Sequence, residues 1–214
     1  MPRRQDHRPA ELRELAIARV QQHLLSQPAS LLSLRQVARD IGYSAGTLIN
    51  LFGSFSLLLL TTNARTLDDI HSRLVSAMAD TRQRGGSRME ELETAALTYA
   101  AYARQHPHAW RLIFELHLDE VTPLPEWQQV RISQLFTLLE NCLARLCPAA
   151  DAGSCEQAAR VIWAGVHGIC TLALDDKLFT SAQNDSQAMI RSLLQHYLHD
   201  WCAVYATPAS DLNP

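Results

Sequence analysis

The sequence lacks most features that mark secreted, membrane or sheet-rich proteins. None of its five cysteines stands in a CxxC pair, so we expect reduced thiols in a cytoplasmic protein rather than disulfides. The first residues lack the apolar segment of a signal peptide, and the leucine run Leu57–Leu60 is far too short to span a bilayer. Eight glycines are few for sheet turns, and no segment alternates with a period of two. We therefore predict an all-α protein with no membrane partner.

Charge is unevenly distributed along the 214 residues. Residues 1–56 contain seven arginines and four acidic side chains, whereas the remainder contains twelve basic and eighteen acidic residues. The hydrophobic content of 47% is ample for a globular core. A modest positive excess at one end of an acidic chain is typical of a domain that binds a short nucleic-acid site rather than coating the polymer.

The segment from Ser33 to Leu60 has the clearest local signals in the chain. Ser33 and Ser44 are good helix N-caps, and Gly42 and Gly53 are typical helix ends. Apolar residues recur between them at three- and four-residue spacing and can pack inward, namely Leu34, Val37, Ile41, Leu48 and Phe52. Two short helices joined by a glycine-containing turn form the helix-turn-helix, a motif that reads DNA.

The outward residues of this motif are small, polar or cationic, which suits contact with phosphates and base edges. We predict a DNA-binding set of Ser33, Arg35, Gln36, Ser44, Ala45, Gly46, Thr47 and Asn50. Arg3, Arg4 and Arg8 are typical of an arm that follows a DNA groove.

Helical patterns continue along the rest of the chain. A first helix from Pro9 ends before Pro28, and a helix from residue 54 or 56 to about Arg84 precedes the linker Gly85–Ser87. Further helices are predicted over about 92–105, 110–117, 132–146, 155–178 and 186–205, with loops at 119–125 and 149–154. About nine helices follow, three in a DNA-binding domain at 1–54 and six in a regulatory domain at 55–214.

The string IGYSAGTLINLFGS, preceded by SLRQVARD, resembles the TetR/AcrR family of bacterial transcriptional regulators. A second string, VIWAGVHGICTLAL, is similar to family members whose C-terminal domain carries a Trp-His-Gly signature, here Trp163 with His167 and Gly168. The resemblance implies a ligand-responsive repressor, without enzymatic activity or cofactor, that binds a pseudo-palindromic double-stranded operator as a homodimer. A small-molecule effector would enter the helical body and release the DNA.

The resemblance also implies a dimer through the last two helices, whose apolar stripes suit a four-helix bundle. The predicted interface comprises Trp163, Val166, Cys170, Leu194, Tyr197, Leu198 and Trp201. Side chains that could line an effector cavity are Trp110, Phe114, His117, Trp163 and His167, although aromatic residues at helical spacing are more often plain core. His167 on an apolar stripe is more often a hydrogen-bonded core or interface residue than a ligand contact.

Three positions depart from the family pattern. Ile49 and Leu51 stand where members often carry Tyr, then His or Tyr, and Phe55 stands where a phosphate-binding Lys is common. This departure motivates an alternative function, a small-molecule-binding or protein-interaction module with weakened DNA binding.

Two chemical readings compete with regulation. Gly42–Gly46 matches GxSxG, the nucleophile elbow of hydrolases, but that elbow needs a strand before its serine and the preceding residues are helical in pattern. His196, His199 and Asp200 could bind a metal ion, yet no HExxH motif or cysteine pair supplies the further ligands of a zinc site. We predict no metal site.

Overall fold

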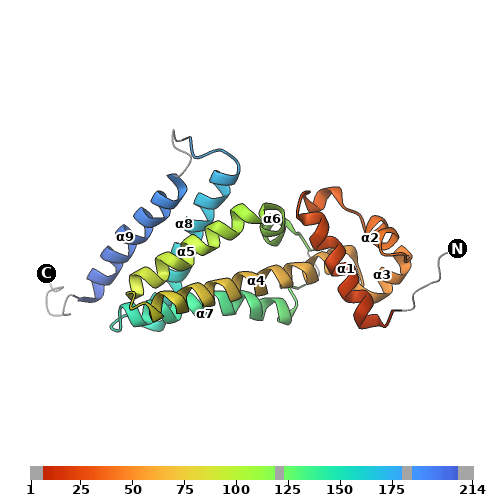
Figure 1. Cartoon of the computed structure of the whole chain (residues 1–214). Helices are drawn as coiled ribbons and strands as arrows, with labels where there is room; N and C mark the ends of the chain where they lie inside the picture. Colours follow the sequence, from red (N-terminus) through yellow and green to blue (C-terminus); the bar gives the residue numbers. More distant parts are fainter. Residues whose placement is uncertain (1–6, 119–122, 180–184, 207–214) are drawn as a thin grey trace. The chain divides into compact units, whose positions relative to one another are not determined.

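The computed structural model describes residues 7–118, 123–179 and 185–206, and this part of the chain is all-α (Figure 1). It contains nine α-helices and one 3-10 helix, which confirms the predicted fold class. The helices are α1 Pro9–Leu24, α2 Leu34–Asp40, α3 Ala45–Phe52, α4 Phe55–Gln83, α5 Arg88–Gln105, α6 Pro107–Glu115, α7 Glu126–Leu146, α8 Ala152–Leu174 and α9 Asp185–Ala206, with the 3-10 helix at Ala29–Leu31.

Contacts divide the chain into two compact units. The first unit comprises Met1–Asp69 and His106–Gln129, and the second comprises Ile70–Gln105 and Val130–Pro214. The first unit thus holds α1, α2, α3, α6 and the first half of α4, while the second holds α5, α8, α9, the rest of α4 and most of α7. The predicted division into a DNA-binding domain at 1–54 and a regulatory domain at 55–214 concerns function rather than contacts, and it stays a prediction.

The first unit is built around one apolar cluster. Its buried members come from α1, α2, α3, the start of α4, α6 and the end of the 3-10 helix, which Leu32 caps: Ala16, Ile17, Val20, Leu24, Leu32, Val37, Ala38, Leu48, Phe52, Leu58, Leu59 and Leu112. Burying such side chains is the main favourable term in folding, at about 1.5–3 kcal/mol for each large aliphatic group. The two short helices α2 and α3, marginal alone, are therefore stabilised by this shared core.

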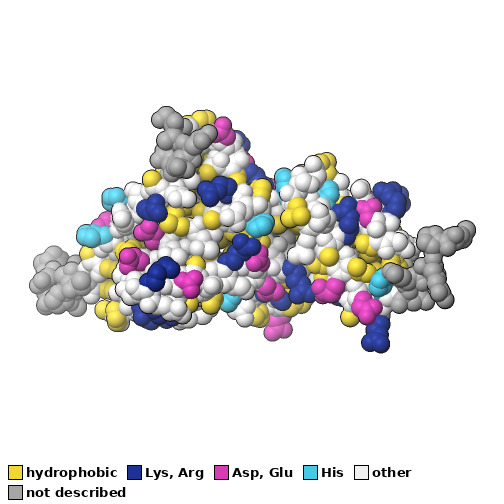
Figure 2. All heavy atoms as spheres, in the orientation of Figure 1, with side chains coloured by type: hydrophobic (Ala, Val, Ile, Leu, Met, Phe, Trp, Pro, Cys, Tyr) yellow, Lys and Arg dark blue, Asp and Glu magenta, His cyan; other side chains and the backbone are white. Residues whose placement is uncertain are grey.

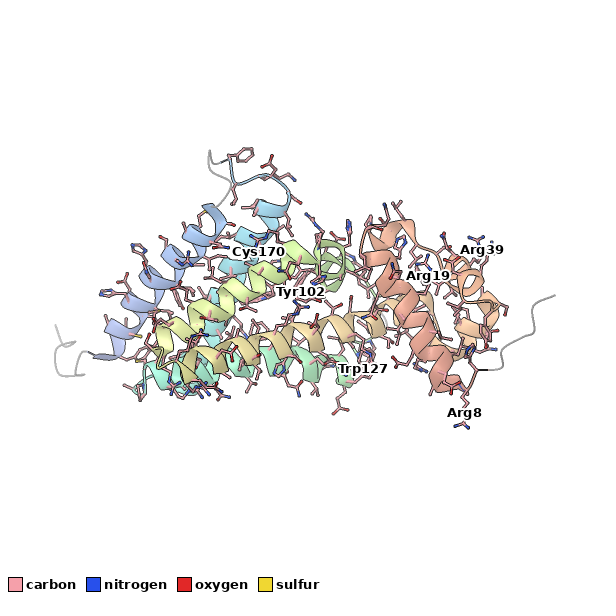
Figure 3. All side chains as sticks on the ribbon, viewed as in Figure 1. Arg8, Arg19, Arg39, Tyr102, Trp127 and Cys170 are labelled. Carbon is pink, nitrogen blue, oxygen red and sulfur yellow. The ribbon has the colours of Figure 1, made fainter. Side chains whose placement is uncertain are left out.

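Charged residues of α1 attach it to neighbouring helices of the first unit. Arg19, which is labelled in Figure 3, donates to the Asp40 carboxylate at the end of α2, 2.7 Å away. Glu14 accepts from Arg65 of α4 at 2.5 Å. Both pairs are partly exposed, so each contributes at most about 1 kcal/mol, and their main effect is orientation.

In the second unit, α8 packs along α9 and α5 packs against both. The approach of α8 to α9 is close at Gly165, where an added Cβ would lie 2.6 Å from Cδ2 of Leu193. The apolar interior is formed chiefly by Leu92, Ala95, Leu143, Ala158, Ile162, Val166, Ile190, Leu194 and Leu198.

A buried carboxylate stabilises the junction of α4 and α5. Glu91 is 0% exposed and accepts hydrogen bonds from Arg82, at 2.8 Å, and from Arg88. These bonds, led by that from Arg82, hold the pKa of Glu91 below its usual value although burial opposes the shift. The charge is thus compensated within the fold, as a buried charge must be.

Several predicted helix boundaries were wrong. The loop expected over 149–154 is shorter, because Asp151 accepts from the Ser154 N–H at 2.8 Å and begins α8 at Ala152. That helix ends at Leu174 rather than near 178, since the chain turns at Asp176, which has a φ of 54°. Helix α7 also begins earlier than expected, at Glu126.

Candidate DNA-binding surface and ligand cavity

The turn between α2 and α3 is fixed by local hydrogen bonds. Gly42 has a φ of 81°, and the Tyr43 N–H donates to the carbonyl of Ala38 at 2.8 Å, which closes α2 in a Schellman motif. Ser44 then caps α3 by accepting from the Thr47 N–H at 3.1 Å. In the same way Ser33 accepts from the Gln36 N–H at 3.2 Å. The predicted caps and glycine turn therefore form as expected.

The predicted DNA-binding residues lie outside the core of the first unit, except Ala45, which packs against the apolar cluster. Beneath them, Val37, Leu48 and Phe52 are buried. Ser33, Arg35, Ser44, Gly46 and Asn50 are exposed, while Gln36, Ala45 and Thr47 are half-buried. Their placement leaves polar groups accessible on a rigid support, and their role in DNA binding stays a prediction.

Arg13 holds α3 in place, a role that sequence reasoning missed. It extends from α1 and donates to the backbone carbonyl of Leu51 at 2.7 Å, and its guanidinium lies 4.8 Å from the centre of the Phe52 ring. A cation at a helix C-terminus satisfies a carbonyl that has no partner within the helix and interacts favourably with the helix dipole. A separation of 38 residues hides this contact from any local pattern.

The three departures from the family pattern are not equivalent in space. Leu51 and Phe55 are partly buried and pack against the apolar cluster of the first unit. Ile49, by contrast, is 42% exposed and stands beside Asn50 on the outer face of α3. Two of the three positions therefore pack against the core, and of the three only Ile49 is an exposed apolar side chain.

The start of the described chain is attached to the same turn. The His7 N–H donates to the Tyr43 hydroxyl at 3.2 Å, and His7 Nδ1 lies 2.8 Å from that oxygen. Arg8 is exposed at the start of α1 (Figure 3). Arg3 and Arg4 lie outside the described residues. On the face seen in Figure 2, basic and acidic side chains are interspersed.

The five predicted cavity residues are divided between the two units. Trp110, Phe114 and His117 belong to the first unit, and Trp163 and His167 to the second. Trp110 is 1% exposed and meets the Phe114 ring edge-on at 5.3 Å, so it is core. His117 is exposed and contacts the carbonyl of Glu115. Helical spacing alone could not separate two sets of aromatic residues that belong to different units.

The second unit contains an apolar cavity between α4, α5, α7 and α8. About 80 Å³ within it is open to the centres of water-sized molecules, well above the roughly 10–15 Å³ that one water needs. Its lining is Ile70, Leu74, Leu92, Ala95, Ala96, Tyr99, Leu135, Phe136, Leu139, Ile162, Trp163 and Val166. Of the predicted ligand contacts, only Trp163 is in this lining.

One polar pair lies at the cavity wall. The Tyr99 hydroxyl is 3.1 Å from Nδ1 of His167, so it bridges α5 and α8. Burial lowers the pKa of His167, which favours a neutral imidazole at physiological pH. The His167 ring lies 5.4 Å from that of Trp163, which meets Phe136 edge-on at 5.6 Å. Sequence reasoning missed Tyr99 because its partner is 68 residues away.

Most of the predicted dimer residues are already covered within one chain. Val166, Cys170, Leu194 and Leu198 are at most 4% exposed, so they have no surface to give to a partner. Trp163, Tyr197 and Trp201 are half-buried. A different stripe of α8 is accessible, at Val161, Ala164, Gly168 and Leu172. These four residues of the predicted stripe are therefore buried inside the second unit of one chain, and the interface itself stays a prediction.

A family model matches a segment that includes most of the second unit. Residues 92–197, which include Tyr99, Phe136, Trp163 and His167, match the tetracyclin repressor-like, C-terminal domain. The chain belongs to the TetR family. The functional class that this membership supports is a transcription regulator. The match does not distinguish the Trp-His-Gly subset, which stays a prediction.

Solved structures share the fold of this TetR-family chain. A Rhodococcus sp. RHA1 protein of unknown function is 19% identical, with a TM-score of 0.71 over 92% of this chain and 98% of that one. A proposed transcriptional regulator from Streptomyces coelicolor A3(2) is 16% identical, with a TM-score of 0.56 over 92% and 98%. A structure from work on control of antibiotic production by bacterial hormones is 19% identical, with a TM-score of 0.54 over 90% and 98%. No curated protein matches significantly.

The described parts of this TetR-family chain lack the geometry that a serine hydrolase or a metal site would need. Ser44 follows helix α2 rather than a strand, and its Oγ lies 2.8 Å from Oγ1 of Thr47, so the GxSxG match is a capped turn. Within the described ranges, no three His, Cys, Asp or Glu side chains are grouped to hold a metal ion.

The cysteines and the helices add two further observations. Burial raises the pKa of Cys170 to about 12, which makes it unreactive.

No single helix among the described residues is long and apolar enough to cross a membrane, although α3 and α4, which meet at a 63° bend, pass that test as a pair.

Proposed function

We propose that this TetR-family protein is a repressor that binds a pseudo-palindromic DNA operator as a homodimer and is released by a small molecule. The observation that carries the proposal is the pair of capped helices α2 and α3, which present a polar face over a buried core. The cavity of the second unit supports the release step.

The outer face of α3 supplies the base contacts. Asn50 can make paired hydrogen bonds to the edge of an adenine, and the exposed Ile49 can pack against the methyl group of a thymine. Gly46, beside the capped start of the helix, allows the backbone to approach the DNA. Arg35 and Ser33 of the preceding helix contact phosphates, which sets the register of α3 in the major groove.

The homodimer uses the exposed side of α8 together with α9. On α8, Val161, Ala164, Gly168 and Leu172 recur at helical spacing and are accessible. Nothing lies within 4 Å of a Cβ added at Gly168, so a second helix can approach there. The 43% exposed Leu172 and 42% exposed Val161 supply apolar area for such a contact. Two protomers place two recognition helices on half-sites about 34–36 Å apart.

The effector enters the cavity of the second unit and acts through α4. Ile70 and Leu74 of α4 line that cavity, while the same helix begins at Phe55, three residues after α3 ends. A coupling of about 2–3 kcal/mol between effector and DNA, equivalent to roughly 30–150-fold in operator affinity, suffices for a switch. The similar structure connected with bacterial hormones supports a small-molecule signal.

Fluorescence anisotropy tests DNA binding directly. Labelled duplexes from the region upstream of the protein's own gene are titrated with full-length protein, and scrambled duplexes of equal length serve as controls. The proposal expects preferential binding of one upstream duplex, with two protomers per site. Equal binding of both duplexes at low salt contradicts it.

A second candidate function is a small-molecule-binding module with weakened DNA binding. It is favoured by the apolar side chains of Leu51 and Phe55, which pack inward where other members place groups that hold phosphates. Each missing phosphate contact reduces the slope of log affinity against log salt by about 0.9. If the slope of log DNA affinity against log salt is near zero and the protein still binds a small molecule, this candidate is favoured over the first.

A further inference from the structure

We propose that the cavity of the second unit takes a compact, uncharged ligand about the size of one ring, with a single hydroxyl-type group that hydrogen-bonds to Tyr99. The inference rests on the proposed function, in which this cavity is the effector site. It is carried by the composition of the wall, the arrangement of its rings and the Tyr99–His167 pair.

The wall disfavours charge. None of the twelve lining side chains is ionisable near neutral pH. The cation of Arg160 lies 4.6 Å from the centre of the Phe136 ring but is paired with Glu140 at 2.7 Å and Glu156 at 3.1 Å. Glu91, next to the lining residue Leu92, is paired with two arginines. An ionised ligand would therefore lose its hydration without gaining a counter-charge.

The size and the rings of the wall favour a single-ring ligand. The cavity holds about 80 Å³, against about 150 Å³ for an apolar protein cavity known to bind benzene. A ligand of one ring thus fills it and displaces lining side chains, which is the response that an effector site requires. Phe136 and Trp163, already edge-to-face at 76°, offer ring contacts of the kind that aromatic groups prefer.

The Tyr99–His167 pair fixes the polar end of the ligand. A hydroxyl has one donor and two acceptor sites, so one hydroxyl can hydrogen-bond to a ligand group as well as to His167. With a neutral imidazole, either tautomer can pair with Tyr99, which then accepts from the ligand or donates to it. A ligand hydroxyl suits both cases, because it can donate or accept.

Four probes that share one ring separate these properties. Full-length protein is titrated by calorimetry at neutral pH with toluene, benzyl alcohol, benzoate and benzylammonium. We expect both neutral compounds to bind, with benzyl alcohol the tighter. We expect the anion and the cation to bind about 100-fold or more weakly, since neither finds a counter-charge.

Matched variants locate the binding site. Tyr99→Phe should weaken benzyl alcohol about 3–10-fold, through loss of one hydrogen bond, and leave toluene unchanged. Tyr102→Phe is the control, since Tyr102 is also buried on α5 but lies outside the lining, with Arg73 over its ring (Figure 3). Ala96→Leu extends into the cavity and should weaken all neutral binding, with thermal melting used to confirm that the variant folds.

Several results overturn the inference. Charged probes that bind within about threefold of benzyl alcohol contradict an uncharged ligand, and so does absence of binding by both neutral probes. Equal losses for toluene and benzyl alcohol in Tyr99→Phe contradict the role of the hydroxyl. Operator binding is measured on the same protein without ligand, so a protein that binds the probes as expected but shows no DNA preference contradicts the proposed function alone.

Discussion

The two units place their functional groups in opposite ways. In the first unit the groups that we propose to contact DNA are on the surface, at Ser44, Gly46 and Asn50, over an apolar cluster. In the second unit the cavity is inside and apolar, while charged groups such as Arg160 and Glu140 pair with each other at the periphery. The difference fits the proposed partners, because DNA requires accessible donors and cations, whereas an apolar ligand requires a site without water.

The largest expected effect comes from removing the partners of a buried charge in the second unit. The double variant Arg82→Ala with Arg88→Ala leaves the Glu91 carboxylate buried and unpaired, and should lower the free energy of unfolding by about 3–5 kcal/mol. Arg84→Ala, in the same turn but bonded only weakly to Thr81 at 3.5 Å, is the control. Chemical denaturation measures both, and equal stability of the two variants would contradict this account.

The same carboxylate predicts a dependence on pH. The folded-state pKa of Glu91 is lowered, chiefly by the hydrogen bond from Arg82, so its stabilising effect is complete above the unfolded value of 4.5. That effect should be lost as the pH falls through the lower, folded-state pKa. Melting temperatures of the wild type and Glu91→Gln should therefore converge below pH 4.5, and a constant difference down to that range would be inconsistent with a paired carboxylate.

The next prediction distinguishes a glycine that stabilises the turn of the first unit from a glycine on its proposed DNA-binding surface. Gly42→Ala should cost about 1–2 kcal/mol, because an alanine is strained at a φ of 81°. Gly46→Ala should not destabilise the fold, since its Cβ would meet Ser44 Oγ at an ordinary 3.7 Å, but should weaken DNA binding by blocking the backbone. Denaturation should therefore show a loss of stability only in Gly42→Ala, and anisotropy should show weaker DNA binding in Gly46→Ala. A loss of stability in Gly46→Ala would contradict this assignment of roles.

The smallest expected effect concerns Ile49. If its side chain packs against a thymine methyl, replacing that thymine by uracil in the preferred duplex should weaken binding by about 0.8 kcal/mol, or roughly fourfold. In Ile49→Ala the same replacement should have little effect. A uracil penalty of equal size in the wild type and the variant would assign the methyl contact to another residue.

The units also differ in how far the sequence predicts them. Ser33, Gly42 and Ser44 act on partners within five residues, so caps and spacing were enough to place α2 and α3. Tyr99 and His167 meet across 68 residues, and Arg13 reaches Leu51 across 38, so no local pattern contains either contact. The stripe of Val166 and Leu194 shows the remaining ambiguity, because an apolar face fits a core and a dimer interface equally well.

The central claim is that the outer face of α3 reads DNA sequence. Full-length protein is used to select duplexes from a random library, and anisotropy then compares the selected duplex with its scrambled form for the wild type, Asn50→Ala and a control, Asn141→Ala, at an exposed position of α7 in the second unit. The account predicts that Asn50→Ala reduces the preference by about 1–3 kcal/mol, or roughly 5–150-fold, while Asn141→Ala keeps it. Selection of no common sequence, or equal preference in all three proteins, would contradict it.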